Sequence, residues 1–106
     1  MEIQELLPLG SVVLLEGAVQ RLIITGRALI VRHDNKEFFF DYAGHLYPDG
    51  VMSSRIAYFN HDAISKVFFM GYNDEANRET VSRIRAEMRN RTDLKRCRAD
   101  WTPIEE

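Results

Sequence analysis

The chain has 106 residues and is short of cysteine, of net charge and of long apolar runs, and each shortage excludes a class of protein. Cys97 is the only cysteine, so the chain can form no internal disulfide, and a reducing compartment suits it. The apolar runs are only a few residues long, well below the roughly 20 residues of a membrane-spanning helix. The formal net charge of −2 provides no overall field that would attract nucleic acid or anionic lipid.

The N-terminal residues also lack the features of a secretory signal. Glu2 and Glu5 stand where a signal peptide carries basic residues, and no A-x-A-like cleavage site follows them. We therefore expect a cytoplasmic protein that does not insert into a membrane.

The composition that remains is that of a globular domain. Hydrophobic residues make up 45% of the sequence and charged residues 28%, which suits a folded core with a solvated surface. We expect residues 1–91 to form a single β-rich domain that ends in a C-terminal helix. Residues 92–106 are expected to form a polar C-terminal tail. Trp101, Pro103 and Ile104 are the residues of that tail expected to anchor it.

Short segments rich in β-branched and aromatic residues, separated by turn residues, predict a series of strands. The expected strands are residues 11–15, 20–25, 28–32, 37–42, 56–59 and 66–70. Asn60 is placed to cap a single helical turn over residues 61–65. The expected turns are residues 16–17, 33–36, 43–44 and 48–50. Gly26 lies between two strand-like segments, where an isolated glycine indicates a bulge or a sharp bend.

A long helix is predicted after the strands. Asn73 is placed to cap it, and acidic residues follow in its first turn. Val81, Ile84 and Met88 form one apolar stripe along a helix that is expected to end near Arg91. Strands joined by short turns and followed by one helix predict an α+β fold, either a small, strongly bent antiparallel sheet or an SH3-like barrel, with one C-terminal amphipathic helix.

The charges are unevenly spread along the chain. Residues 78–98 hold eight basic and three acidic side chains, a local charge of +5, while the remainder carries six basic and thirteen acidic, or −7. Such an asymmetry can mark a contact surface, although a solvated helix face would show the same pattern. Arg78, Arg85 and Arg89 on the predicted helix are the candidate partner-binding residues.

No pattern in the sequence predicts an active site, a metal site or a cofactor. His33, His45 and His61 are far apart, and no C-x-x-C, G-x-S-x-G or G-K-[ST] motif occurs. Asp41 lies between two aromatic residues, and we expect its carboxylate to bond turn backbone rather than to act in catalysis. We therefore expect no catalytic residue, no metal and no cofactor, in a protein that is not an enzyme.

A nucleic-acid alternative stays open, because exposed rings can stack bases. Its candidate residues are Phe38, Phe39, Phe40, Tyr42, Tyr47 and Arg32. A domain of this size needs such rings for its core, since each buried phenylalanine contributes roughly 1.5–3 kcal/mol. The acidic residues among them, such as Asp34 and Glu37, would also repel phosphate. We therefore interpret these rings as core and keep nucleic-acid binding by a small barrel as a lesser alternative.

Three stretches form a recognisable set: residues 7–13 (LPLGSVV), 41–50 (DYAGHLYPDG) and 59–67 (FNHDAISKV), which leads to Gly71 and Tyr72. This set resembles a family of small bacterial proteins of unknown function. Its members are often encoded beside LXG toxins of the type VII secretion system in Gram-positive bacteria. His45 stands where many relatives carry a cysteine, which argues against an essential side chain there.

The resemblance implies a non-enzymatic accessory or adaptor that binds a protein partner, namely a toxin, a targeting factor or a secretion component. The alternative within the same setting is an immunity protein for a neighbouring toxin. The resemblance brings no catalytic residues, and it leaves the oligomeric state open. We interpret the motif residues as structural, at bends, turns and packed rings: Gly10, Gly26, Asp41, Tyr42, Gly44, Tyr47, Pro48, Gly50, Asn60 and Gly71.

Overall fold

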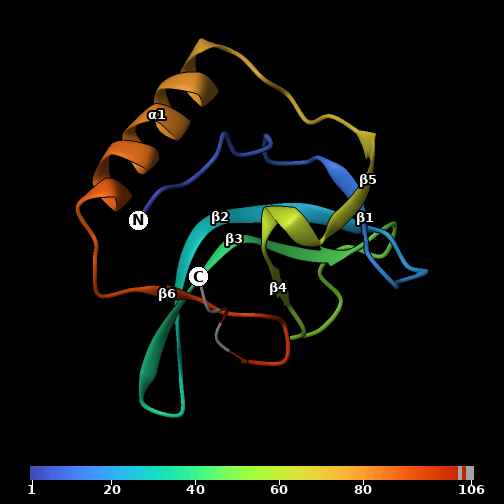
Figure 1. The fold of residues 1–106 in the computed structure, drawn as a ribbon. Helices are drawn as coiled ribbons and strands as arrows, with labels where there is room; N and C mark the ends of the chain where they lie inside the picture. The colour runs from blue at the N-terminus through green and yellow to red at the C-terminus, as the bar shows by residue number, and fades with distance from the viewer. Residues whose placement is uncertain (103, 105–106) are drawn as a thin grey trace.

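A computed structural model describes residues 1–102 and 104 and places one helix beside a six-stranded sheet (Figure 1). The elements are β1 (Val12–Leu15), β2 (Leu22–His33), β3 (Lys36–Leu46), β4 (Ala57–Phe59), the 3₁₀ turn η1 (His61–Ala63), β5 (Ile64–Phe69), α1 (Glu75–Arg89) and β6 (Lys95–Arg96). The predicted α+β class is confirmed. No helix in the described part of the chain is long and apolar enough to cross a membrane.

The sheet is open rather than closed into a barrel. Its strand order is β4-β3-β2-β1-β5 with antiparallel pairing, and β6 pairs with β3 in parallel. Within residues 1–102, β4 and β5 form the two ends of that order and do not pair with each other. The bent antiparallel sheet is therefore the form that the chain adopts, and the SH3-like barrel is not.

The long hairpin of β2 and β3 carries the bend. The two predicted strands 20–25 and 28–32 are one strand, with the register shift between Ile24 and Gly26 that the isolated glycine indicated. The predicted loop 33–36 is a tighter turn, because Asp34 and Asn35 take φ values of +51° and +64°. Left-handed backbone at both central residues is what a two-residue hairpin of this twist requires.

Two glycines allow close approach of neighbouring backbone. Gly44 was predicted in a turn but lies inside β3, where an added Cβ would stand 2.9 Å from the carbonyl oxygen of Ile23 in β2. A Cβ on Gly71 would collide with the carbonyl of Leu9. Any side chain at these positions would push the paired segments apart, which explains the glycines without invoking a ligand.

The helix begins one residue later than predicted. Asp74, not Asn73, is the N-cap, and its carboxylate accepts a hydrogen bond of 2.9 Å from the amide of Asn77. A carboxylate at this place satisfies a free amide and also meets the positive end of the helix dipole. Val81 and Met88 are the buried residues of α1, as the predicted stripe requires, and the helix ends at Arg89 rather than Arg91.

The segment expected as a polar tail returns to the sheet. It contains β6, and Leu94 and Cys97 beside this strand are buried. Trp101 packs edge-on against Phe40 with ring centroids 5.5 Å apart, as expected of an anchor, whereas Pro103 lies outside the described residues.

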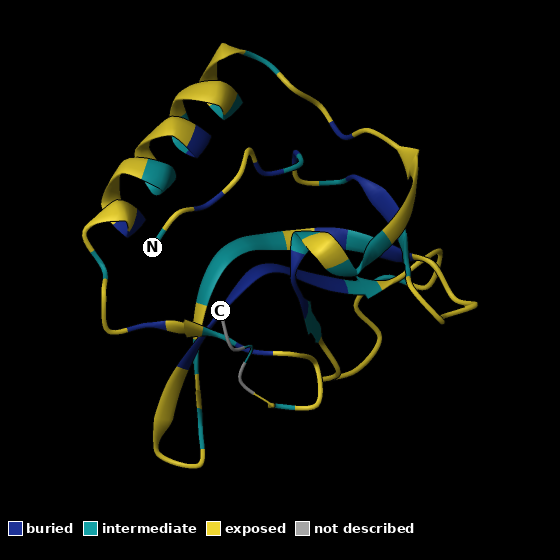
Figure 2. Ribbon diagram, in the orientation of Figure 1, coloured by how far each residue is buried: buried dark blue, intermediate teal, exposed yellow. Residues whose placement is uncertain are grey.

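The main core lies between the sheet and α1, and the N-terminal segment runs through it (Figure 1). Ile3 and Leu6 of that segment join buried side chains of β1, β2, β3, β4 and α1 in one cluster. Figure 2 shows the contrast along the sheet, since β3 is largely buried while β5 and the outer side of α1 are exposed.

Candidate functional site

The three candidate arginines of α1 have different surroundings. Arg78 is exposed, whereas Arg85 is half-buried and donates from Nε to the carbonyl of Ile3 at 2.9 Å. The Nε atom of Arg89 lies 3.6 Å from a carboxylate oxygen of Glu2, with both side chains exposed. Two of the three therefore face the N-terminal segment, so the set does not form a single free surface.

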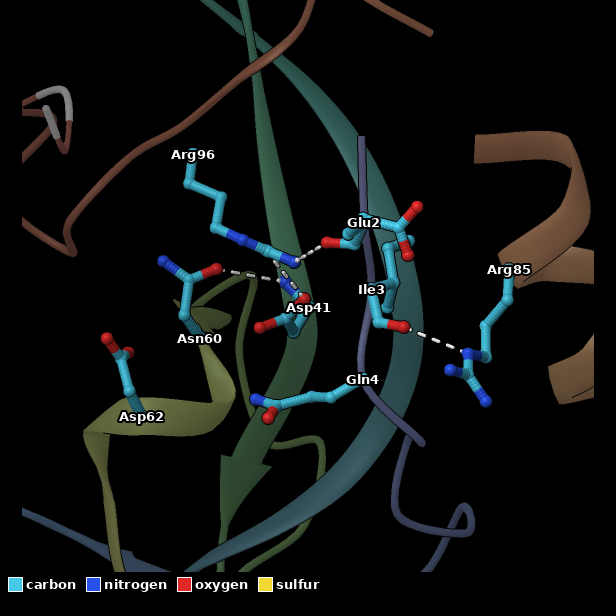
Figure 3. Close-up of a pocket in the computed structure, with 8 residues that line it drawn as sticks. All are labelled: Glu2, Ile3, Gln4, Asp41, Asn60, Asp62, Arg85 and Arg96. Atoms are coloured by element: carbon cyan, nitrogen blue, oxygen red, sulfur yellow. Dashed lines mark hydrogen bonds and ion pairs between the residues drawn. The ribbon is translucent and has the colours of Figure 1, made fainter. Parts of the chain in front are cut away.

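A polar hollow of about 440 Å³ opens beside that segment (Figure 3). It is lined by Glu2, Ile3, Gln4, Asp41, Asn60, Asp62, Arg85 and Arg96. Asp41 is 2% exposed and is its most deeply placed charge, with Arg96 Nη1 3.1 Å from one carboxylate oxygen. Burial raises the pKa of the Asp41 carboxyl, and the His61 amide and the Arg96 guanidinium oppose that rise.

Both carboxylate oxygens of Asp41 hold neighbouring segments. One accepts from Arg96, and the other accepts from the backbone amide of His61 at 2.9 Å. The predicted bond from Asp41 to turn backbone is thereby confirmed. Arg96 lies 55 residues further along the chain, so this carboxylate ties the C-terminal segment to β3.

Asn60 stands before η1 as predicted, but its side chain does not cap the turn. Its amide oxygen accepts from the backbone amide of Asp41 at 3.1 Å, and its amide nitrogen donates to the carbonyl of Cys97 at 2.9 Å. The capping prediction is wrong because the side chain of this buried asparagine instead bonds two backbone groups that are distant along the chain. Among the described residues, no buried side-chain nitrogen or oxygen is left without a hydrogen-bond partner.

Tyr42 is fully buried, and its hydroxyl lies between two segments. It accepts from the amide of Leu7 at 2.9 Å and lies 2.7 Å from Nδ1 of His61. Burial raises the pKa of Tyr42 to about 12. The hydroxyl therefore keeps its proton at neutral pH and can donate a hydrogen bond to His61. The other two motif tyrosines differ, because Tyr47 is at the surface and Tyr72 is almost fully exposed.

The three histidines do not converge. His33 stacks on Trp101 at a centroid distance of 4.0 Å, His45 bonds the Thr25 hydroxyl, and His61 bonds Tyr42. Residues 1–102 and 104 contain no group of three or more His, Cys, Asp or Glu side chains that could hold a metal ion. Burial raises the pKa of the Cys97 thiol, which disfavours a reactive thiolate.

The aromatic platform imagined for nucleic acid is absent. Phe39, Phe40 and Tyr42 have no exposed side chain, and Phe38 is 8% exposed. The interpretation of these four rings as core is confirmed. Of the rings on which the nucleic-acid alternative depended, Tyr47 stays at the surface, at 36% exposed.

Among the described residues, the longest run of exposed large apolar side chains lies instead at the edge strand β5. Val67, Phe68, Phe69 and Met70 are 40%, 44%, 62% and 54% exposed. In the described structure β5 pairs only with β1, so its other side is an unpaired strand edge. We call residues 64–70 the β5 edge. Such edges are usually short, charged or covered, and an exposed apolar edge indicates an interaction surface.

Two cations lie over exposed rings at the β5 edge and next to it. The Nζ atom of Lys66 is 4.6 Å from the centre of the Phe68 ring, and the guanidinium of Arg21 is 5.4 Å from the same ring. Arg21 also lies 4.9 Å from the ring centre of Tyr47. We call these four residues the cation–aromatic cluster. It adds positive charge to an otherwise apolar surface.

A family described as a domain of unknown function, DUF4176, matches residues 6–80, more than half of the chain. The chain belongs to this family. No curated protein and no solved structure matches the chain. The DUF4176 match includes the sheet from β1 to β5 and the first part of α1, and it names neither a secretion system nor a toxin.

The three stretches singled out from the sequence lie within the matched residues 6–80, but nothing in the sequence indicated the exposed β5 edge. Residues 66–70 were predicted as a strand, yet a short apolar run gives no sign of whether it will lie inside a sheet or at its edge. No sequence pattern indicated the cation–aromatic contacts of Arg21 and Lys66, because the ring that each cation meets depends on how the strands pair. Arg96 was counted within a basic stretch, and its contact with Asp41 depends on tertiary structure.

Proposed function

We propose that the chain is a non-enzymatic protein-binding module whose β5 edge takes up an extended segment of a partner protein. The observation that carries the proposal is the exposed apolar edge strand, with Phe68 44% and Phe69 62% exposed. An added strand would pair with the unpaired side of β5, and main-chain hydrogen bonds would supply affinity for almost any extended sequence.

The side chains of the β5 edge favour a particular kind of segment. Full burial of an exposed phenylalanine contributes roughly 1.5–3 kcal/mol, and covering Phe68 and Phe69 would contribute the part of it that their exposed fractions of 44% and 62% represent. Lys66 and Arg21 beside them favour acidic side chains in the partner. The preferred partner segment is therefore extended and combines apolar with acidic residues.

The resemblance to proteins encoded beside LXG toxins supports a specific setting for this activity. The partner in that setting is a type VII secretion toxin, its targeting factor or a secretion component. The module then acts in the cytoplasm before export. An immunity role would use the same surface, and it differs in that the bound toxin would lose its activity.

The test is co-expression of the full chain with the products of its neighbouring genes, followed by size-exclusion chromatography of the complexes. We expect one neighbour to bind, and Phe68→Glu with Phe69→Glu to weaken binding by at least about tenfold, because two anchors are lost. The matched control is Val51→Glu with Met52→Glu, which alters two exposed apolar residues outside β5.

Two results would contradict the proposal separately. If a neighbour binds equally well to the wild-type chain and the β5 variant, the β5 edge is not the binding surface. If no neighbour binds at all, the link to secretion fails. Survival of cells that express a bound toxin in active form would identify the immunity role.

A further inference from the structure

The N-terminal segment, residues 1–7, lies in a groove without joining the sheet or forming a helix. It runs between α1 and the sheet (Figure 1). Two of its side chains, Ile3 and Leu6, are each 3% exposed and reach the main core, while the intervening Gln4 and Glu5 are exposed. The segment thus binds as an extended peptide with two apolar anchors three residues apart.

Side chains of the surrounding elements, rather than neighbouring strands, hold the main chain of this segment. Four such bonds come from β2, β3, α1 and β6. They join Arg96 Nη2 to the Glu2 carbonyl (3.0 Å), Arg85 Nε to the Ile3 carbonyl (2.9 Å), the Leu7 amide to the Tyr42 hydroxyl (2.9 Å), and Arg27 Nη1 to the Leu7 carbonyl (3.4 Å). Bonds of this kind recognise an extended backbone whatever its side chains are.

The groove is wider than the segment that fills it. The hollow of about 440 Å³ lies along Glu2, Ile3 and Gln4, with Asp41 and Asn60 on its other side (Figure 3). Glu2 also lies near Arg89, at 3.6 Å between their charged groups. The wall of the groove therefore carries positive charge where an acidic residue precedes the first apolar anchor, Ile3.

We propose that this groove is a peptide-binding site, which the chain's own N-terminal segment occupies in cis. Its second occupant is an extended segment of a partner protein with the same chemistry: an acidic residue, an apolar anchor, two spacer residues and a second apolar anchor. The cis segment then acts as a built-in competitor that keeps the groove filled until such a partner displaces it. This surface is separate from the β5 edge, so the inference does not depend on the proposed function.

The matched family region begins at residue 6, so Leu6 lies inside it and Ile3 lies outside it. Arg85 and Arg96, which bond the first carbonyls of the segment, also lie outside it. The part of the groove around Ile3 is therefore an addition to the region that the family match defines.

The experiment measures binding of a fluorescein-labelled peptide with the sequence of residues 1–9 to full-length chains by fluorescence anisotropy. In the chain carrying Ile3→Asp, the cis segment loses its first anchor and the groove becomes available. We expect this variant to bind the peptide at least about tenfold more tightly than the wild-type chain, because cis occupancy lowers apparent affinity. A peptide carrying I3D and L6D should not bind.

Two control chains define the result. Glu5→Gln changes an exposed spacer of the same segment that does not line the hollow, and it should bind the peptide as weakly as wild type. Phe68→Glu alters the β5 edge alone and should leave peptide binding unchanged. The outcomes for the two surfaces are therefore distinguishable.

Loss of folding in the Ile3→Asp chain would still give an answer. Added wild-type peptide should then restore its circular dichroism and raise its unfolding temperature with peptide concentration, because a ligand that binds only the folded state stabilises it. A folded variant that does not bind, an unfolded variant that the peptide does not rescue, or equal binding by wild type and variant would each overturn the proposal.

Discussion

The same residue type has opposite fates in two strands of this molecule. Residues 38–40 of β3 are three consecutive phenylalanines and are 8%, 0% and 0% exposed. Phe68 and Phe69 of β5 are also consecutive, yet they are 44% and 62% exposed. Burial in this fold therefore depends on where a strand lies in the sheet, and not on how apolar its sequence is.

The position of each strand explains the difference. β3 lies between β2 and β4, and the C-terminal segment crosses its outer face, with Trp101 packed 5.5 Å from Phe40. Phe39 faces the main core, so the two faces of β3 are covered by different parts of the chain. β5 has one neighbouring strand, and nothing in the described chain covers its outer edge. The comparison teaches that β3 is fixed by cover on both faces, while β5 keeps an exposed and unpaired edge.

The largest expected effect contrasts one ring from each strand. Phe39→Ala should lower the free energy of unfolding by about 3–5 kcal/mol, because it leaves a cavity in the main core. Phe69→Ala should change it by no more than about 0.5 kcal/mol, because most of that ring already contacts water. Urea denaturation of both variants measures the two values. An equal loss in both variants would mean that a second copy of the chain covers β5 in solution.

Much of the fold could be predicted from local pattern. The β-branched and aromatic segments indicated the strands, and the spacing of Val81 and Met88 indicated the buried stripe of α1. Gly26 indicated the bulge of β2 from one residue. These features depend on neighbours within a few positions, so sequence alone contains the information.

The candidate surfaces could not be predicted in the same way. Whether a phenylalanine pair is buried depends on strand order, and the groove around Ile3 depends on side chains that lie more than eighty residues away, as Arg85 does. The segment of residues 92–102 looked like a polar tail because Leu94 and Cys97 stand among charged residues. Their burial follows from pairing of β6 with β3, which no local pattern specifies.

The next largest expected effect compares the loss of one charged contact in β3 with the loss of one charge in β5. Asp41 of β3 is buried against Arg96, whereas Lys66 of β5 is exposed. Arg96→Met should lower the free energy of unfolding by about 3 kcal/mol. This is the lower end of the range for breaking a buried ion pair, because the hollow beside Asp41 admits water. Lys66→Met should cost no more than about 0.5 kcal/mol. A negligible loss in the Arg96 variant would show that water in the hollow solvates the Asp41 carboxylate as well as the guanidinium does.

The smallest expected effect is the contribution of Asp41 in β3 to the pH dependence of the free energy of unfolding. Burial raises the pKa of this carboxyl above its ordinary value of 3.8, so in that pH range the native chain binds more protons than the unfolded chain. The stability of wild type relative to Asp41→Asn should therefore fall as the pH rises from 3.8 through the raised pKa, and then level off. Urea titrations of both chains at successive pH values measure this difference.

A surface carboxyl provides the matched control with the opposite sign. The hydrogen bond from Arg91 lowers the pKa of Asp93 to about 2, so its contribution is present above the ordinary value and is lost as the pH falls toward 2. Stability relative to Asp93→Asn should therefore rise with pH over that range. If the Asp41 difference also rises with pH, the bonds from Arg96 and the His61 amide outweigh the burial of the carboxyl. The ionised Asp41 carboxylate would then stabilise the folded state rather than destabilise it.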